Sequence, residues 1–255
     1  MRRSRLNGSV YRYWSSYAIA YVLAKRLSGK VDFLDAGGRD GGTIELLRNM
    51  SLGGRYTCLD LAPSPVPWKE GNFDVEAVQS RFEDYHPNRQ YDVVLFEGSM
   101  ECVEDCRNIS WLGHCLKPGG FVVVTVATKN AARCMYPGFW KDGGRYGRDR
   151  DEVGQEFRQL RLIVEEIIPL VGATGRIMQY MIWMLLGAQV RRLWRKTIGV
   201  VWPKLRDIDP MIPVNRLVNE TTRRVDRLFP FWRIGHCIVL RPIGDTTAFA
   251  VRPRS

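Results

Sequence analysis

The sequence predicts an α/β fold: a doubly wound, mostly parallel sheet with helices on both faces. Two observations lead to this prediction. Short apolar segments alternate with helical patterns along the first half of the chain, and the first apolar segment runs directly into a glycine-dense turn. Continuous apolar strands that alternate with helices are typical of a parallel sheet buried on both faces. Ligands of such sheets bind beyond the carboxyl ends of the strands, so we expect the functional site there.

The elements of this fold can be placed in chain order. The first is an aromatic-rich amphipathic helix over residues 9–28, which ends at the pair Ser28-Gly29. Three further helices are expected over Gly41–Met50, Glu104–Leu116 and Asp151–Leu160. The expected strands are Val31–Asp35, Arg55–Asp60, Phe73–Gln79, Tyr91–Glu97, Phe121–Thr128, Arg161–Leu170 and Ile234–Pro242.

An insertion of about sixty residues separates the last two expected strands, which is long for a connection. It contains an apolar run over 177–188, too short to span a bilayer. One interpretation is a buried lid helix or a dimer contact. The other, which we favour, is a helix lying at a membrane surface. Three tryptophans and a basic cluster suit that surface; these residues are Trp183, Trp194, Trp202, Arg191, Arg192, Arg195 and Lys196.

The domain organisation follows from these elements. We expect a single domain over 1–255, built from an N-terminal helix (1–30), a cofactor-binding core (31–170), a helical basic insertion (171–233) and the last strand (234–242). A chain of this length buries a full hydrophobic core.

The net charge of +11 predicts an anionic neighbour, either nucleic acid, a phosphorylated substrate or a membrane surface. We do not favour nucleic acid, because no recognised nucleic-acid-binding module occurs. The six cysteines form no CxxC pair, and the basic start of the sequence lacks the continuous apolar core of a secretory leader. We therefore expect no leader, reduced thiols and no metal site. The expected location is the cytoplasm, with the insertion reaching the inner face of the membrane.

The glycine-dense turn is the first part of the expected site. Asp35 ends the first strand, and the glycines after it allow a sharp turn and close approach of a ligand. Free amides at the start of the next helix face that ligand. Asp60 ends the second strand, where a carboxylate can accept both hydroxyls of a ribose. The turn lacks the GxGxxG spacing of dinucleotide sites, and no phosphate-binding GKS/T loop is present.

Four segments in this order, LDAGGRDGG, YTCLDLA, YDVVLFEGSMECVED and CLKPGGFVVVTV, resemble the class I S-adenosylmethionine-dependent methyltransferases. The resemblance is greatest to the branch called methyltransferase type 11. It covers residues 31–128 well and the final strand loosely. It implies a Rossmann-like sheet of seven strands whose last strand is antiparallel, and S-adenosylmethionine as the cofactor.

The resemblance also implies roles for particular residues. The acid and glycines of the first segment would hold the amino-acid end of the cofactor, and Asp60 its ribose. Ser80 would lie near the adenine amine, and Glu97 and Gly98 beside the sulfonium. The expected cofactor-binding residues are Asp35, Gly37, Gly38, Gly41, Asp60, Leu61, Ser80, Arg81, Glu97 and Gly98.

Three residues depart from the family pattern: Arg39 replaces the middle glycine, Ser80 an aspartate, and Cys102 a histidine. Alignment of the acceptor with an electrophilic methyl group supplies much of the rate of methyl transfer. A hydroxyl acceptor additionally gains from a general base, and we name Glu101 and Tyr146 as candidate catalytic residues.

The predicted function is O- or C-methylation of an amphiphilic or membrane-delivered acceptor, such as a lipid-linked glycan or an isoprenoid-type molecule. Two alternatives stay open. One is a soluble methyltransferase that acts on an anionic small molecule. The other is a non-catalytic, cofactor-binding scaffold, an alternative suggested by the departures from the family pattern at Arg39, Ser80 and Cys102. The oligomeric state is left open.

Overall fold

The computed structural model describes residues 10–39, 42–63, 72–100, 103, 105–129, 150–171, 189, 193, 196–197 and 233–244. The chain divides into two compact units. One consists of Met1–Tyr17 with Pro169–Gly235, and the other of Ala18–Ile168 with His236–Ser255. The second unit contains most of the sheet and all of the site residues treated below.

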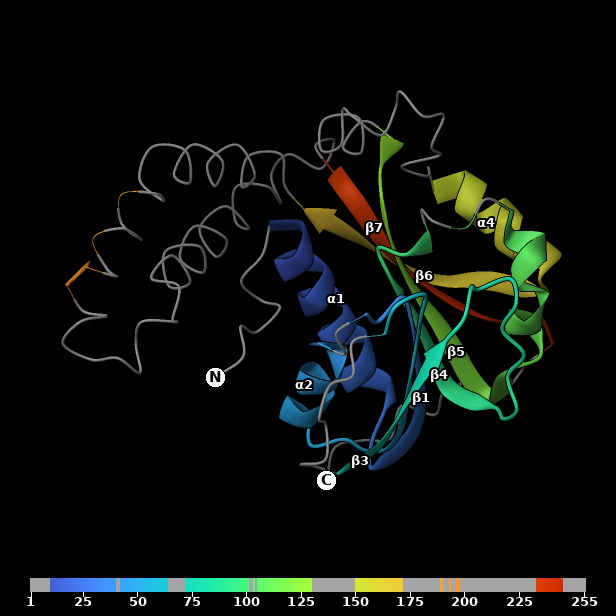
Figure 1. Ribbon diagram of the computed structural model, residues 1–255. Helices are drawn as coiled ribbons and strands as arrows, with labels where there is room; N and C mark the ends of the chain where they lie inside the picture. Colours follow the sequence, from blue (N-terminus) through green and yellow to red (C-terminus); the bar gives the residue numbers. More distant parts are fainter. Residues whose placement is uncertain are drawn as a thin grey trace. The chain divides into compact units, whose positions relative to one another are not determined.

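The sheet has seven strands in the order β3-β2-β1-β4-β5-β7-β6 (Figure 1). Their bounds are Lys30–Ala36 (β1), Gly53–Asp60 (β2), Phe73–Gln79 (β3), Tyr91–Glu97 (β4), Leu116–Ala127 (β5), Leu162–Val171 (β6) and Arg233–Pro242 (β7). Strand β1 pairs in parallel with β2 on one side and with β4 on the other. The chain therefore winds outward from β1 in both directions, as predicted for a doubly wound sheet.

All seven expected strands are present, each within a few residues of its predicted bounds. The β2–β3 and β4–β5 pairs are also parallel. Strand β7, the last in the chain, lies between β5 and β6 in the sheet rather than at its edge. The result is a mixed sheet, mostly parallel with some antiparallel strands, which confirms the predicted fold class.

Helices form at the four expected places, with one difference in type. The α-helices are α1 (Val10–Arg26), α2 (Gly42–Asn49) and α4 (Arg150–Gln159). The segment expected as an α-helix over 104–116 is instead a 3-10 helix, η3 (Cys106–Gly113), with a kink at Ile109. The Asp105 carboxylate accepts the Arg107 N–H at 2.9 Å and starts the helix late. Strand β5 begins at Leu116, and the helix ends at Gly113, three residues before its predicted end.

Two apolar layers enclose the central strands, because successive side chains point to opposite faces. One face of β4 and β5 packs with η3 and α4 through Phe96, Val122, Leu112 and Phe157. Side chains that point to the other face of the sheet, such as Phe33, are equally buried. In Figure 1, α2 lies on one side of these strands, and η3 and α4 lie on the other.

An ion-pair cluster joins the end of α1 to β6. The Arg26 guanidinium contacts Glu165 at 3.1 Å and Glu166 at 2.6 Å, and it lies 5.5 Å from the ring centroid of Phe121. The Arg26 side chain is largely buried, so both carboxylates and the ring contribute to its environment. This cluster lies entirely within the second unit.

Most of the predicted insertion over 171–233 lies outside the described residues, including the apolar run over 177–188. Its membrane-surface and lid interpretations therefore stay predictions. In the part of the chain that the structure describes, no helix is both long and apolar enough to cross a membrane.

Candidate active site

The carboxyl ends of four neighbouring parallel strands meet at one edge of the sheet. We call this the carboxyl edge and define it as residues 35–39, 60–62, 80–82 and 97–100. Nine of the ten residues expected to bind a cofactor lie here. The tenth, Gly41, is outside the described residues, as are the catalytic candidates Glu101 and Tyr146 and the departure at Cys102.

Asp35 lies at the end of β1 with only 1% of its surface exposed. The Tyr56 hydroxyl of β2 donates a hydrogen bond to its Oδ2 atom. Burial of a carboxylate is costly unless hydrogen bonds or charges compensate it. The sequence therefore places an acid in the core layer of the sheet, and the neighbouring strand supplies a donor for it.

The turn after Asp35 has no room for side chains. Gly37 has φ +87°, and its N–H donates to the Leu59 carbonyl at 2.7 Å. A Cβ atom at Gly37 would lie 2.4 Å from the Ser99 Cβ, and one at Gly38 would lie 2.7 Å from Asp35 Oδ2. Glycine is required at both positions, and it keeps the backbone accessible.

Arg39 occupies the position of the middle family glycine and has φ +32°, in the left-handed region that non-glycine residues seldom adopt. Its N–H donates to Asp60 Oδ2 at 3.1 Å, while the Ala62 N–H donates to Oδ1 at 3.0 Å. Asp60 thus joins the glycine turn to the end of β2. Each carboxylate oxygen has a further lone pair that can accept a ribose hydroxyl.

The segment after β3 is held by its own hydrogen bonds. The Ser80 N–H donates to the Asp60 carbonyl at 3.1 Å, and the Ser80 hydroxyl donates to the Arg81 carbonyl at 3.0 Å. The hydroxyl proton therefore stabilises the turn, and its oxygen can accept from an amine. Leu61, next to Asp60, has 64% of its surface exposed and offers an apolar side chain at the same edge.

Two residues at the carboxyl edge were not predicted from the sequence as site residues. Ser99, after Glu97 and Gly98, is buried and donates to the Ala36 carbonyl at 2.6 Å, which ties the end of β4 to the end of β1. The Phe82 ring lies 3.6 Å from the position of a Cβ on Gly37 and packs edge-on against Phe96. The available sequence signal was their position, since Ser99 lies two residues after the end of β4 and Phe82 three residues after the end of β3.

An unpartnered hydroxyl lies beside the glycine turn, in the first turn of α2. Thr43 is 4% exposed, and its Oγ1 has no hydrogen-bond partner in the part of the chain described. A buried hydroxyl in this state costs about 1–3 kcal/mol. Together with the crowded glycines and the two acids, it fits a ligand that carries carboxylate, amino and ribose groups.

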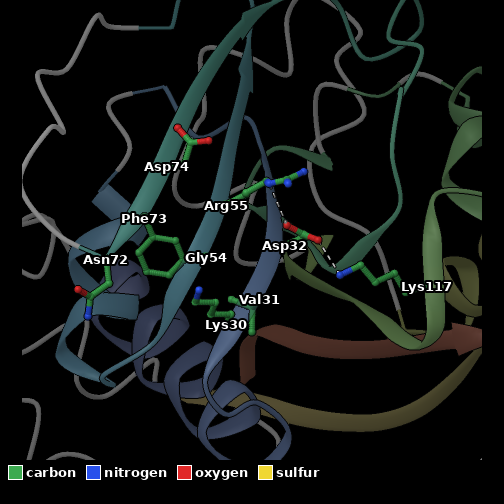
Figure 2. Close-up of a pocket in the computed structure, with 9 residues that line it drawn as sticks. All are labelled: Lys30, Val31, Asp32, Gly54, Arg55, Asn72, Phe73, Asp74 and Lys117. Atoms are coloured by element: carbon green, nitrogen blue, oxygen red, sulfur yellow. Dashed lines mark ion pairs between the residues drawn. The ribbon is translucent and has the colours of Figure 1, made fainter.

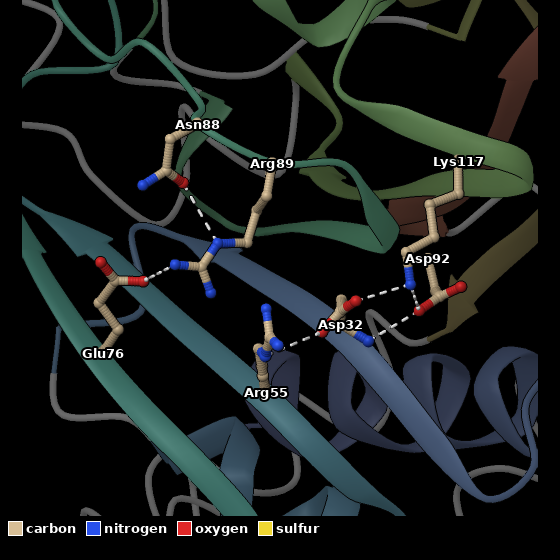
Figure 3. Close-up of polar contacts among 7 residues, drawn as sticks. All are labelled: Asp32, Arg55, Glu76, Asn88, Arg89, Asp92 and Lys117. Carbon is tan, nitrogen blue, oxygen red and sulfur yellow. Dashed lines mark hydrogen bonds and ion pairs between the residues drawn. The ribbon is translucent and has the colours of Figure 1, made fainter.

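A separate hollow of about 690 Å³ lies at the opposite ends of the strands (Figure 2). We call this region the amino edge; the hollow is lined by Lys30, Val31, Asp32, Gly54, Arg55, Asn72, Phe73, Asp74 and Lys117. Three of its charged side chains, Asp32, Arg55 and Lys117, form ion pairs with one another or with the nearby Asp92 (Figure 3). Lys117 Nζ lies 2.6 Å from Asp32 and 2.8 Å from Asp92, and Arg55 lies 4.0 Å from Asp32.

The ion pairs change the titration of Lys117. Partial burial lowers its pKa, but hydrogen bonds to Asp32 and Asp92 outweigh this and raise the pKa above its ordinary value. Lys117 and Arg55 balance the charges of Asp32 and Asp92, so this ion-pair cluster presents little net charge to a ligand. In the residues described, no group of three or more His, Cys, Asp or Glu is arranged to hold a metal ion.

Comparisons with known proteins bear on the family and on the fold of this chain. A family model described as a methyltransferase domain matches residues 11–173. Among solved structures, the [4+2]-cyclase SpnF aligns with a TM-score of 0.54 at 16% identity, covering 89% of this chain and 81% of that one. No curated protein matches the sequence.

A second solved structure is a SAM-dependent methyltransferase from Geobacter sulfurreducens in complex with S-adenosyl-L-homocysteine. It aligns with a TM-score of 0.50 at 16% identity, covering 89% of this chain and 90% of that one. At such identities the likenesses establish the fold alone.

Proposed function

This chain belongs to the methyltransferase-domain family, and on that premise we propose that it binds S-adenosylmethionine at the carboxyl edge and transfers its methyl group. One observation carries the proposal. The Asp60 carboxylate accepts the N–H groups of both Arg39 and Ala62, so the ribose-binding acid and the glycine turn form one preorganised unit. Arg39 adopts a φ of +32° and donates its N–H to Asp60, so the turn accommodates this non-glycine residue.

Each residue of the carboxyl edge has a distinct task in this proposal. The cofactor supplies a methyl group on a positively charged sulfur. Asp35 accepts hydrogen bonds from the amino group at the amino-acid end, and Asp60 accepts those of the ribose hydroxyls. The Thr43 hydroxyl donates to the carboxylate at that same end, which satisfies a buried donor. Glu97 and Gly98 border the sulfur, so the methyl group faces the space beyond β4.

The proposed acceptor is amphiphilic or membrane-delivered, such as a lipid-linked glycan or an isoprenoid-type molecule, methylated on oxygen or carbon. The apolar run and basic cluster of the insertion support this choice. Glu101 and Tyr146 are the proposed general bases for a hydroxyl acceptor. A soluble anionic acceptor is the second candidate, favoured by the net charge of +11 alone.

Calorimetric titration with S-adenosylhomocysteine tests cofactor binding directly. We expect Asp60→Ala to weaken binding at least tenfold, because hydrogen bonds to a charged group contribute about 1.5–3 kcal/mol. Asp74→Ala is the matched control, since it removes a strand acid at the amino edge. A folded wild-type protein that binds no S-adenosylhomocysteine would overturn the proposal.

Methyl transfer from labelled S-adenosylmethionine separates the candidate activities. We expect label in the lipid fraction of a cell extract, together with flotation of the protein with anionic liposomes. Label in the soluble fraction without flotation would favour the anionic acceptor. Binding of the cofactor without label in either fraction would support the non-catalytic scaffold.

A further inference from the structure

Tyr56 makes the hydrogen bond that joins β2 to the buried acid of β1. The strand register aligns Phe33 with Tyr56 and Asp35 with Cys58. Side chains two residues apart on a strand share a face, so Tyr56 and Asp35 are diagonal neighbours on the same face of the sheet. The length of the tyrosine side chain spans that diagonal, and its hydroxyl donates to Asp35 Oδ2.

The Tyr56 ring is held firmly in place. It is fully buried and stacks on Phe33, with ring centroids 5.7 Å apart and planes inclined by 8°. The Phe73 ring contacts it edge-on at a centroid distance of 6.4 Å. Aromatic packing on two sides fixes the position of the hydroxyl, so the donor is preorganised.

The glycine turn restrains the Asp35 carboxylate at the same oxygen. A Cβ on Gly38 would lie 2.7 Å from Asp35 Oδ2, so the turn backbone passes close to the atom that accepts from Tyr56. A hydrogen bond from a neutral phenol orients a carboxylate without cancelling its negative charge.

We propose that Tyr56 is a positioning residue that holds the Asp35 carboxylate in the orientation that binds the amino group of the cofactor. The inference rests on the proposed function and adds a residue that the family pattern does not assign. Tyr56 acts through Asp35, so its removal selectively weakens ligands that carry the amino-acid end.

The test compares two ligands by calorimetry. S-adenosylhomocysteine carries the amino-acid end, whereas 5′-methylthioadenosine has the same adenosine and thioether without it. Tyr56→Phe removes only the hydroxyl and keeps the ring. We expect it to weaken S-adenosylhomocysteine about tenfold and to leave methylthioadenosine unchanged. Tyr85→Phe is the matched control, because it removes another buried hydroxyl, bonded to Tyr91 at 2.7 Å; it should leave both affinities unchanged.

A double-mutant cycle shows whether the hydroxyl acts through the acid. In an Asp35→Asn background, Tyr56→Phe should cause no further loss of S-adenosylhomocysteine affinity. Equal weakening of both ligands, or an additive loss in the cycle, would overturn the positioning role. Wild-type protein that binds neither ligand would instead overturn the proposed function and this inference with it. Melting temperatures of all variants establish that each is folded.

Discussion

The two edges of the sheet hold their carboxylates in different ways. At the amino edge, Asp32 and Asp92 share the Lys117 ammonium, and Arg55 supplies a second cation 4.0 Å from Asp32, so two cations balance two carboxylates (Figure 3). At the carboxyl edge, Asp35 accepts from a phenol and Asp60 from two backbone amides. Neutral donors orient a carboxylate and keep its charge available to a ligand. The hollow at the amino edge therefore indicates a ligand-binding site less strongly than do the neutral donors that contact the carboxylates at the carboxyl edge.

The largest expected difference between the edges is in the loss of stability when a glycine is replaced by alanine. Gly37→Ala places a Cβ 2.4 Å from the Ser99 Cβ at φ +87°, whereas Gly119→Ala at φ +78° meets nothing within 4 Å. Left-handed strain of about 1–2 kcal/mol applies to both, and overpacking of about 1–3 kcal/mol applies to Gly37 alone. Chemical denaturation should show Gly37→Ala as the less stable variant, with S-adenosylhomocysteine binding lost. Equal effects of the two variants would contradict the crowding at Ser99.

The next largest effect is a loss of stability at high pH that originates near the amino edge. Burial raises the pKa of the Cys115 thiol, next to the start of β5, to about 12. Between about pH 9 and 12 the unfolded thiol ionises and the folded one does not, so stability falls as pH rises. Cys115→Ala should reduce this slope by up to about 1.4 kcal/mol per pH unit. Denaturation midpoints from pH 7 to 11 measure it; an unchanged slope would refute the assignment.

A smaller effect distinguishes two buried threonines. Thr43 and Thr57 both have a hydroxyl without a hydrogen-bond partner among the described residues. Thr→Val at either position removes that hydroxyl with little change of shape and should stabilise the ligand-free protein by about 1 kcal/mol. Only Thr43→Val should weaken S-adenosylhomocysteine, because Thr57 lies within β2. Thermal unfolding and calorimetry check the pair, and weaker binding by Thr57→Val would break the distinction.

The smallest expected effect is at the ion pairs of the amino edge. Lys117→Met leaves Asp32 and Asp92 without their shared cation and should destabilise the fold by at most about 1 kcal/mol, since the pairs are partly exposed. Lys30→Met, a lysine lining the same hollow, should have no measurable effect. Neither change should alter the affinity for S-adenosylhomocysteine. A tenfold loss of affinity in Lys117→Met would show that the two edges are coupled.

The strands were predictable from sequence because most are apolar runs bounded by turn residues, while β3 alternates apolar and polar residues. The acids Asp35 and Asp60 were predictable as site residues, because they end two such runs. The contacts that orient these acids were not. The Tyr56–Asp35 hydrogen bond depends on strand order and register, and so does the Ser99–Ala36 hydrogen bond that ties the end of β4 to β1. The start of η3 was also not predicted, because it depends on the cap at Asp105, and neither was its 3-10 form with the kink at Ile109.

The ion pairs of Arg26 have a consequence for folding during synthesis, because they form only after most of the sheet has been made. Arg26 and Glu165 are separated by 139 residues of sequence, and strands β1 to β5 all lie between them. A nascent chain can pair β1 with β2 and β4 and form the glycine turn before Glu165 and Glu166, the carboxylate partners of Arg26, leave the ribosome. Until then the Arg26 guanidinium lacks its ion pairs with Glu165 and Glu166, and α1 lacks its contact with β6. Nascent chains that end before residue 165 should therefore remain sensitive to proteases at α1, and synthesis of β6 should bring protection.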